Sequence, residues 1–146
     1  MNGRSLIKRK LSAISIQLSA KAKGAKMKDF RQLKVWDKAH QLTLAIYKTT
    51  KTFPTEERYG LTSQLRRASS SIPANIAEGC CRGGDRELAQ FLQIAMSSAG
   101  EVEYHLLLAH HLKYFDKQNY NQLNSNITEV KQMLSSFIKK LRKPKS

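Results

Sequence analysis

Apolar residues recur at intervals of three or four positions along most of the chain from residue 33 to residue 141. This spacing places them on one face of an amphipathic helix. It occurs in four segments, at residues 33–52, 61–79, 86–114 and 117–141. Within these segments no strand pattern competes with the helical one. The pattern therefore predicts an all-α protein with four helices.

The last segment has the most regular pattern, because its apolar spacing alternates between three and four without interruption. Such a seam suits helices that pack nearly parallel to their neighbours. Its apolar positions are Tyr120, Leu123, Ile127, Val130, Leu134, Phe137 and Leu141.

Short connections rich in helix-breaking residues separate the four segments. Pro54 ends the first segment, and Gly83-Gly84 forms a turn before an expected N-cap at Asp85. Asp116 is expected to cap the last helix. Short connections favour antiparallel neighbours, so the predicted fold is an antiparallel up-and-down four-helix bundle over residues 29–142.

The second segment carries a proline, Pro73, and three consecutive serines from Ser69 to Ser71. A proline inside a helix lacks a backbone donor and clashes one turn back, which costs ~3 kcal/mol. We expect a continuous helix that bends between Ser69 and Pro73. The small residues of this block are expected to pack closely against the small residues 95–100 of the third segment.

The charge of the chain is concentrated at its two ends. The sequence has 26 basic and 11 acidic residues, for a formal net charge of +15. Residues 1–28 and 139–146 hold thirteen of these basic residues and no acidic one. Residues 1–28 are expected to form a basic arm, disordered or weakly helical, and residues 143–146 a basic tail. Basic ends on a nearly neutral body favour a polyanionic partner, with a merely solvated tail as the alternative.

The sequence lacks the motifs of common enzymes. Cys80-Cys81 has no metal-ligand spacing and would form a strained disulfide, so free thiols in a reducing cytoplasm are expected. Glu101 and His105 lie one helical turn apart, but a metal would need further converging carboxylates. The glycines around the cysteines lack the Lys-Ser/Thr ending of a phosphate-binding loop. No apolar run approaches the ~20 residues that span a bilayer. We expect a cytoplasmic protein that is not an enzyme and holds no metal and no cofactor.

Distinctive motifs link the first three segments to a known family. They are Leu33-Lys34-Val35-Trp36, Tyr59-Gly60-Leu61, Gln64-Leu65-Arg66-Arg67-Ala68, Ser71 to Gly79 (SIPANIAEG), and Glu101-Val102-Glu103. With these motifs, residues 30–141 resemble the 23S rRNA intervening-sequence proteins, which are encoded in or near insertions in bacterial rRNA genes. The resemblance implies an antiparallel four-helix bundle that assembles as a homopentameric ring and has no catalytic residue. A related branch serves as the accessory subunit of the reverse transcriptase in diversity-generating retroelements.

The first functional hypothesis is nucleic-acid binding, with RNA favoured over DNA. An ion pair of Arg66 or Arg67 with Glu78 or Asp37 remains an alternative role for the two arginines. The residues expected to contact phosphates are Arg66, Arg67, Lys139, Lys140, Arg142 and Lys143.

The second hypothesis is an assembly module whose partner is a protein, such as a reverse transcriptase. Trp36, Tyr47 and Tyr59 are the large side chains that could form subunit contacts. Their alternative role is packing in the core of the bundle.

Overall fold

The computed structural model describes residues 28–144, so the predicted basic arm at 1–28 lies almost entirely outside the described residues. The all-α prediction is confirmed, because this part of the chain contains four long helices and no strand. The elements are the 3-10 helices η1 (Phe30–Gln32) and η2 (Thr55–Glu57) and the α-helices α2 (Lys34–Thr50), α3 (Leu61–Cys81), α4 (Asp85–His111) and α5 (Lys117–Leu141).

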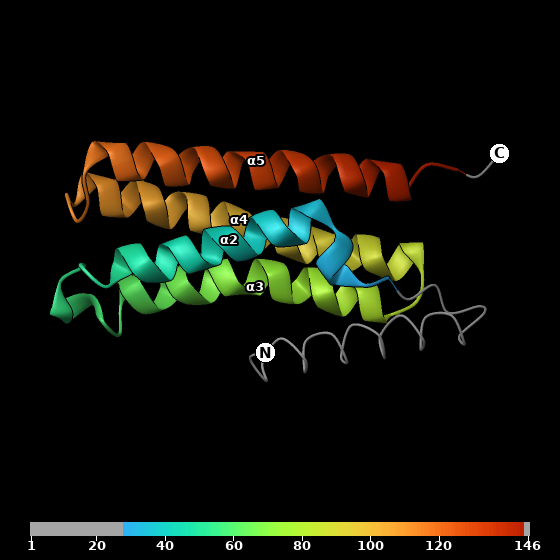
Figure 1. The fold of residues 1–146 in the computed structure, drawn as a ribbon, viewed down its shortest axis with the longest axis horizontal. Helices are drawn as coiled ribbons and strands as arrows, with labels where there is room; N and C mark the ends of the chain where they lie inside the picture. The colour runs from blue at the N-terminus through green and yellow to red at the C-terminus, as the bar shows by residue number, and fades with distance from the viewer. Residues whose placement is uncertain (1–27, 145–146) are drawn as a thin grey trace, which may run out of the picture.

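The four long helices lie side by side, and successive helices turn back at alternate ends of the molecule (Figure 1). α3 packs against α2 and α4, and α5 packs against α4 and α2. Within the described residues no Cα atom of α2 lies within 8 Å of one in α4, and none of α3 lies within 8 Å of one in α5. The helices therefore occupy four corners, and each sequence neighbour is also a neighbour in space.

The core lies along the axis between the four helices. Its fully buried large side chains are Leu42, Ile46, Leu65, Ile72, Ile76, Leu92, Leu106, Ile127 and Leu134, with Val102 and Val130. The regular seam predicted for the last segment is confirmed, since Leu123, Ile127, Val130 and Leu134 are buried and the remaining positions are half-buried. A Leu or Ile side chain buried in this way contributes roughly 1.5–3 kcal/mol.

Both ends of α5 and the start of α3 match the prediction, and the other five helix ends differ from it by one to three residues. Asp85 is the first residue of α4, whereas Gly84 occupies the N-cap position without a side-chain bond. The predicted cap at Asp116 is confirmed, because its carboxylate accepts the backbone N–H of Asn119 at 2.7 Å. α4 ends at His111 and not at residue 114, because Lys113 adopts a left-handed conformation with φ of 63°. The N–H of Tyr114 then donates to the carbonyl of Ala109, which closes the helix end.

α3 continues without interruption through Pro73, as predicted, whereas the bend stays a prediction. Pro73 has no N–H, so the Ser69 carbonyl one turn earlier receives no helical hydrogen bond from it. The hydroxyl of Thr43 on α2 lies 3.0 Å from this carbonyl oxygen and 2.9 Å from the carbonyl oxygen of Ala39. Both distances allow the single hydroxyl proton of Thr43 to bond either carbonyl oxygen. A donor from the neighbouring helix therefore compensates for the missing N–H.

The small residues of α3 and α4 come into direct contact, as the sequence predicts. The hydroxyl groups of Ser71 and Ser98 are 2.9 Å apart across the two helices. Further along α3, a Cβ atom added at Gly79 would lie 2.9 Å from side-chain atoms of Leu88 and Phe91. Small side chains at these positions allow α3 and α4 to approach closely.

Candidate nucleic-acid interface

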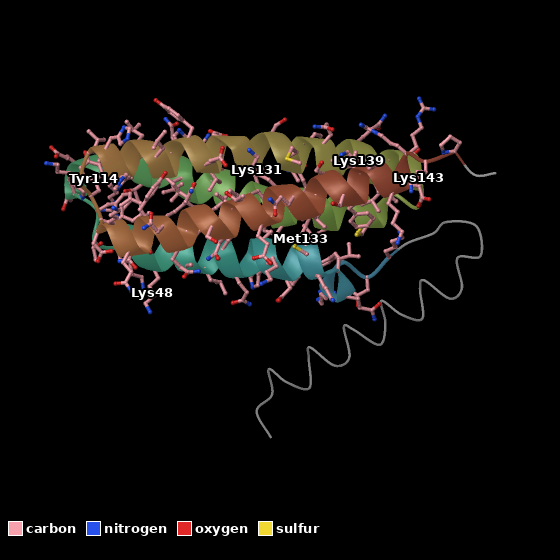
Figure 2. The ribbon with its side chains drawn as sticks, turned by 90° about the horizontal axis from the view of Figure 1, so that it is seen from above. Lys48, Tyr114, Lys131, Met133, Lys139 and Lys143 are labelled. Atoms are coloured by element: carbon pink, nitrogen blue, oxygen red, sulfur yellow. The ribbon has the colours of Figure 1, made fainter. Side chains whose placement is uncertain are left out.

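Four of the six predicted phosphate contacts lie together where α5 ends. Lys139 and Lys140 form its last turn, Arg142 is its C-cap, and Lys143 follows. All four side chains are exposed. Figure 2 shows Lys139 and Lys143 at the end of α5 opposite Tyr114. Cations at the carboxyl end of a helix are favoured by its dipole, so this arrangement stabilises α5 as well as presenting charge.

Three further basic residues lie near this end, and sequence reasoning did not assign them to the site. Arg86 and Arg142 line the same surface hollow of about 470 Å³, between the start of α4 and the end of α5. Lys28 places its ammonium group 5.5 Å from the ring centre of Phe137 on α5. Its backbone N–H donates to the carbonyl of Cys80, which precedes Arg82 at the end of α3. We call Lys28, Arg82, Arg86, Lys139, Lys140, Arg142 and Lys143 the basic end.

Most of the charge at the basic end is not neutralised by an ion pair. Arg82 is paired with Glu78 at 2.9 Å and also lies over the ring of Phe91. The other six residues of the basic end form no ion pair within residues 28–144. Six unpaired cations on one end make a surface that attracts phosphate groups.

The buried thiol beneath the basic end is chemically inert. Cys80 is buried, and its pKa is raised to about 11, chiefly by burial and then by the neighbouring Cys81 thiol. Cys80 is therefore protonated at neutral pH and is not a nucleophile. Cys81 is exposed and free.

Arg66 is turned toward α2 and not toward a carboxylate. Its Nε donates to the hydroxyl of Thr50 at 2.8 Å, and its Nη2 donates to the carbonyl of Tyr47 at 3.3 Å. The guanidinium also stacks 4.8 Å from the ring centre of Tyr47. Within residues 28–144 the alternative ion pairs are not formed, since Glu78 pairs with Arg82 and Asp37 has no ion pair. Arg66 thus ties the end of α2 to α3.

Arg67 is exposed and lies apart from the basic end. It lines a hollow of about 360 Å³ between α3 and α4, together with Gln64, Ala68, Ser71, Ser98 and Glu101. Cys80 follows Arg67 by thirteen positions in α3, which corresponds to about 20 Å along the helix. The structure therefore brings together four of the six predicted contacts and leaves the two arginines of α3 in a separate region.

Within the described part of the chain, no three His, Cys, Asp or Glu side chains are grouped so that they could hold a metal ion. His105 is buried, and its Nδ1 has no hydrogen-bond partner there. No helix between residues 28 and 144 has the length and apolar character needed to cross a membrane.

The fold and the basic end define a small four-helix protein with a cationic surface at one end of its helices. The profile of the 23S rRNA-intervening sequence proteins matches residues 31–136, and the chain belongs to this family. No curated protein sequence matches it. It is also similar to a crystal structure of a protein of unknown function from the S23 ribosomal protein family of Bacteroides thetaiotaomicron. That similarity has 30% sequence identity and a TM-score of 0.65, and it covers 72% of this chain and 98% of the other.

Proposed function

We propose that this protein is a non-enzymatic RNA-binding accessory protein whose basic end contacts the phosphate backbone. The observation that carries the proposal is the gathering, at one end of the four helices, of six cations from separate segments that form no ion pair within residues 28–144. Phosphate contacts of this kind position a polyanion without reading its sequence. The family name supports RNA over DNA as the polyanion. Two adjacent free thiols fit a protein that works in the reducing cytoplasm.

The proposal is tested by gel shifts with a structured RNA at two salt concentrations. The variant Lys139→Gln/Arg142→Gln/Lys143→Gln removes three charges from the basic end. Its matched control, Lys51→Gln/Arg58→Gln/Lys113→Gln, removes two exposed lysines and one exposed arginine elsewhere.

The basic-end variant is expected to bind more weakly, and its slope of log K against log salt should fall by about 2 to 3, at ~0.7–0.9 per phosphate contact. The control variant should stay close to the unmodified protein. Equal losses in the two variants would mean that net charge alone drives binding, which would refute a role for the basic end.

We further propose that the subunit, an antiparallel up-and-down bundle, assembles as a homopentameric ring. Exposed apolar side chains support this arrangement, because they occupy two different corners. Leu44 and Tyr47 on α2 are 51% and 42% exposed, and Ile94 and Tyr104 on α4 are 49% and 58% exposed. Two unlike faces on one subunit favour head-to-tail contacts, which close into rings.

The oligomeric state is measured by light scattering. Tyr104→Arg should dissociate the ring, because it places a charge in the proposed contact. A single-subunit mass for the unmodified protein would contradict the ring.

The second candidate function is that of an accessory subunit that binds a reverse transcriptase. Tyr59, which is 88% exposed in the loop between α2 and α3, offers a contact for a protein partner. Trp36 does not, because it packs against the core beside Phe30 and His40. The test mixes this protein with a purified reverse transcriptase, treats the mixture with nuclease and then isolates this protein. A reverse transcriptase that stays bound would favour this function, whereas its loss after the treatment would favour RNA binding.

A further inference from the structure

The outer face of α5 differs from the other exposed helix faces in its side-chain chemistry. α5 packs on α2 and α4 through its buried seam. Exposed positions opposite this seam include, at helical spacing, Gln118, Asn121, Ser125, Thr128, Gln132, Ser136 and Lys139, and Lys143 lies just beyond the helix end. We call this row the α5 track. Its first six positions are uncharged hydrogen-bonding groups, and its last two belong to the basic end. The exposed Glu129 lies on the same face. Figure 2 looks onto this side of the molecule.

Negative charge is almost absent along α5. Residues 118–128 contain no charged residue at all, although a quarter of the whole sequence is charged. The only carboxylate on the helix is Glu129, and it is paired with Lys38 on α2 at 3.4 Å. A polyanion lying along α5 therefore meets no unpaired carboxylate of this helix before it reaches the basic end.

The start of the track is hollowed and carries free amides. Gln118, Asn121, Gln122 and Ser125 line a shallow surface hollow of about 540 Å³ together with Lys117. Gln122 is bound to Asn126 within the helix at 3.1 Å. The side chains of Gln118 and Asn121 form no hydrogen bond within residues 28–144, so both can bond a ligand.

An amide side chain both donates and accepts, so it can pair with the edge of a nucleobase. Base edges are accessible in single-stranded RNA, whereas the deep, narrow major groove of duplex RNA hides them. From Gln118 to the end of α5 at Leu141 the helix rises by about 35 Å, which corresponds to about ten stacked nucleotides at ~3.4 Å each. Resting on the function proposed above, we infer that the α5 track binds a single-stranded stretch of RNA. Its unpaired bases contact Gln118 and Asn121, and its phosphates contact Lys139 and Lys143.

The exposed apolar residues of the protein point to other faces for protein contacts. Among the described residues, the large exposed apolar side chains lie on α2, on α4 and in the loops, and none lies on α5. A second copy of the chain or a helical partner would gain little apolar burial on the α5 track. The chemistry of this face suits a hydrated, hydrogen-bonding, anionic ligand.

The experiment measures fluorescence anisotropy with a labelled single-stranded RNA of about twelve adenylates and with the same strand in a duplex. The test variant is Gln118→Ala/Asn121→Ala, and the matched control is Gln41→Ala/Gln93→Ala, which removes exposed amides from α2 and α4. All four positions are exposed in helices, where alanine is the most favourable residue, so both variants should fold.

The unmodified protein should prefer the single strand. The test variant should bind the single strand about tenfold more weakly, with the duplex affinity and the salt slope unchanged, and the control variant should bind normally. Lys139→Gln/Lys143→Gln should instead lower the salt slope by about 1.4, at ~0.7 per contact with a single strand. If the test variant bound the single strand as tightly as the unmodified protein, the proposed binding of RNA by the α5 track would be refuted. The proposed role of the basic end would not be affected. Binding of neither RNA by the unmodified protein would overturn the proposed function itself.

Discussion

Removing the Thr43 hydroxyl should destabilise the protein because Pro73 leaves a gap in the hydrogen bonds of α3. Thr43→Val keeps the shape of a buried side chain and deletes the donor to the Ser69 carbonyl. Ser69 is 0% exposed, so water cannot replace that donor. A buried acceptor without a partner costs about 1–3 kcal/mol, and burial of the added methyl group offsets up to ~0.8 kcal/mol. The expected loss of unfolding free energy is therefore about 1–2 kcal/mol.

The same substitution should cost less when residue 73 has an N–H. Pro73→Ala supplies a donor in helical register with the Ser69 carbonyl, so Thr43 is no longer needed there. A double-mutant cycle of Thr43→Val and Pro73→Ala should thus give a coupling of about 1 kcal/mol. Urea denaturation at one fixed protein concentration measures each free energy, because an oligomer's apparent stability depends on concentration.

Thr128→Val is the matched control for this cycle. Thr128 is exposed on α5, and its hydroxyl bonds only the Asn124 carbonyl of its own helix, at 2.8 Å. Its loss should change the unfolding free energy by less than about 0.5 kcal/mol. If Thr43→Val lowers the unfolding free energy by the same amount with and without Pro73→Ala, the Thr43 hydroxyl does not replace the N–H that Pro73 lacks, and the reasoning is wrong.

Three further predictions follow from the helix ends and the titratable groups. Lys113→Gly should raise the unfolding free energy by about 1 kcal/mol, because Lys113 holds a φ of 63° that glycine adopts without strain; an unchanged urea midpoint would contradict this. Thiol titration of the native protein at neutral pH should modify Cys81 alone, and a denaturant should expose both cysteines. The pKa of Tyr114 is raised, first because its hydroxyl donates a hydrogen bond to Glu57 at 3.0 Å. This bond therefore stabilises the folded protein fully below pH ~10, the pKa of an unfolded tyrosine, and the stabilisation is lost as the pH rises through the higher pKa of the folded state. Ultraviolet titration should show that Glu57→Gln lowers this pKa.

The periodic pattern predicted most of the fold because helical burial is a local property of the sequence. In α5 the predicted seam and its Asp116 cap both have their expected roles, since each depends on residues three or four positions apart. The end of α4 was misplaced for the opposite reason. Left-handed backbone is usual for glycine, and nothing in the sequence marks Lys113 as a residue that adopts it.

Contacts between helices were not predictable from the sequence in the same way. Thr43 and Ser69 are 26 positions apart, and their bond depends on how far α2 and α3 slide along each other. The sequence could show that Pro73 needs compensation, but not which residue supplies it. Arg86 was missed because a lone arginine at a helix start carries no motif. It joins the site only because α4 begins beside the end of α5.

Arg66 and Arg67 show why charge in a sequence is a weak guide to a binding site. The two residues are adjacent and chemically identical, yet they have different surroundings because successive helical positions differ by 100° in direction. Arg66 is directed at α2, where Thr50 and Tyr47 engage it. Arg67 is directed at solvent beside α4. Under the proposed function, removing Arg66 should therefore weaken RNA binding only by loosening the contact between α2 and α3, whereas residues of the basic end are placed to contact a phosphate directly. A charged residue can belong to the interface only if the folded protein leaves it without an ion pair. Other unpaired cations must also lie close enough to contact the same ligand.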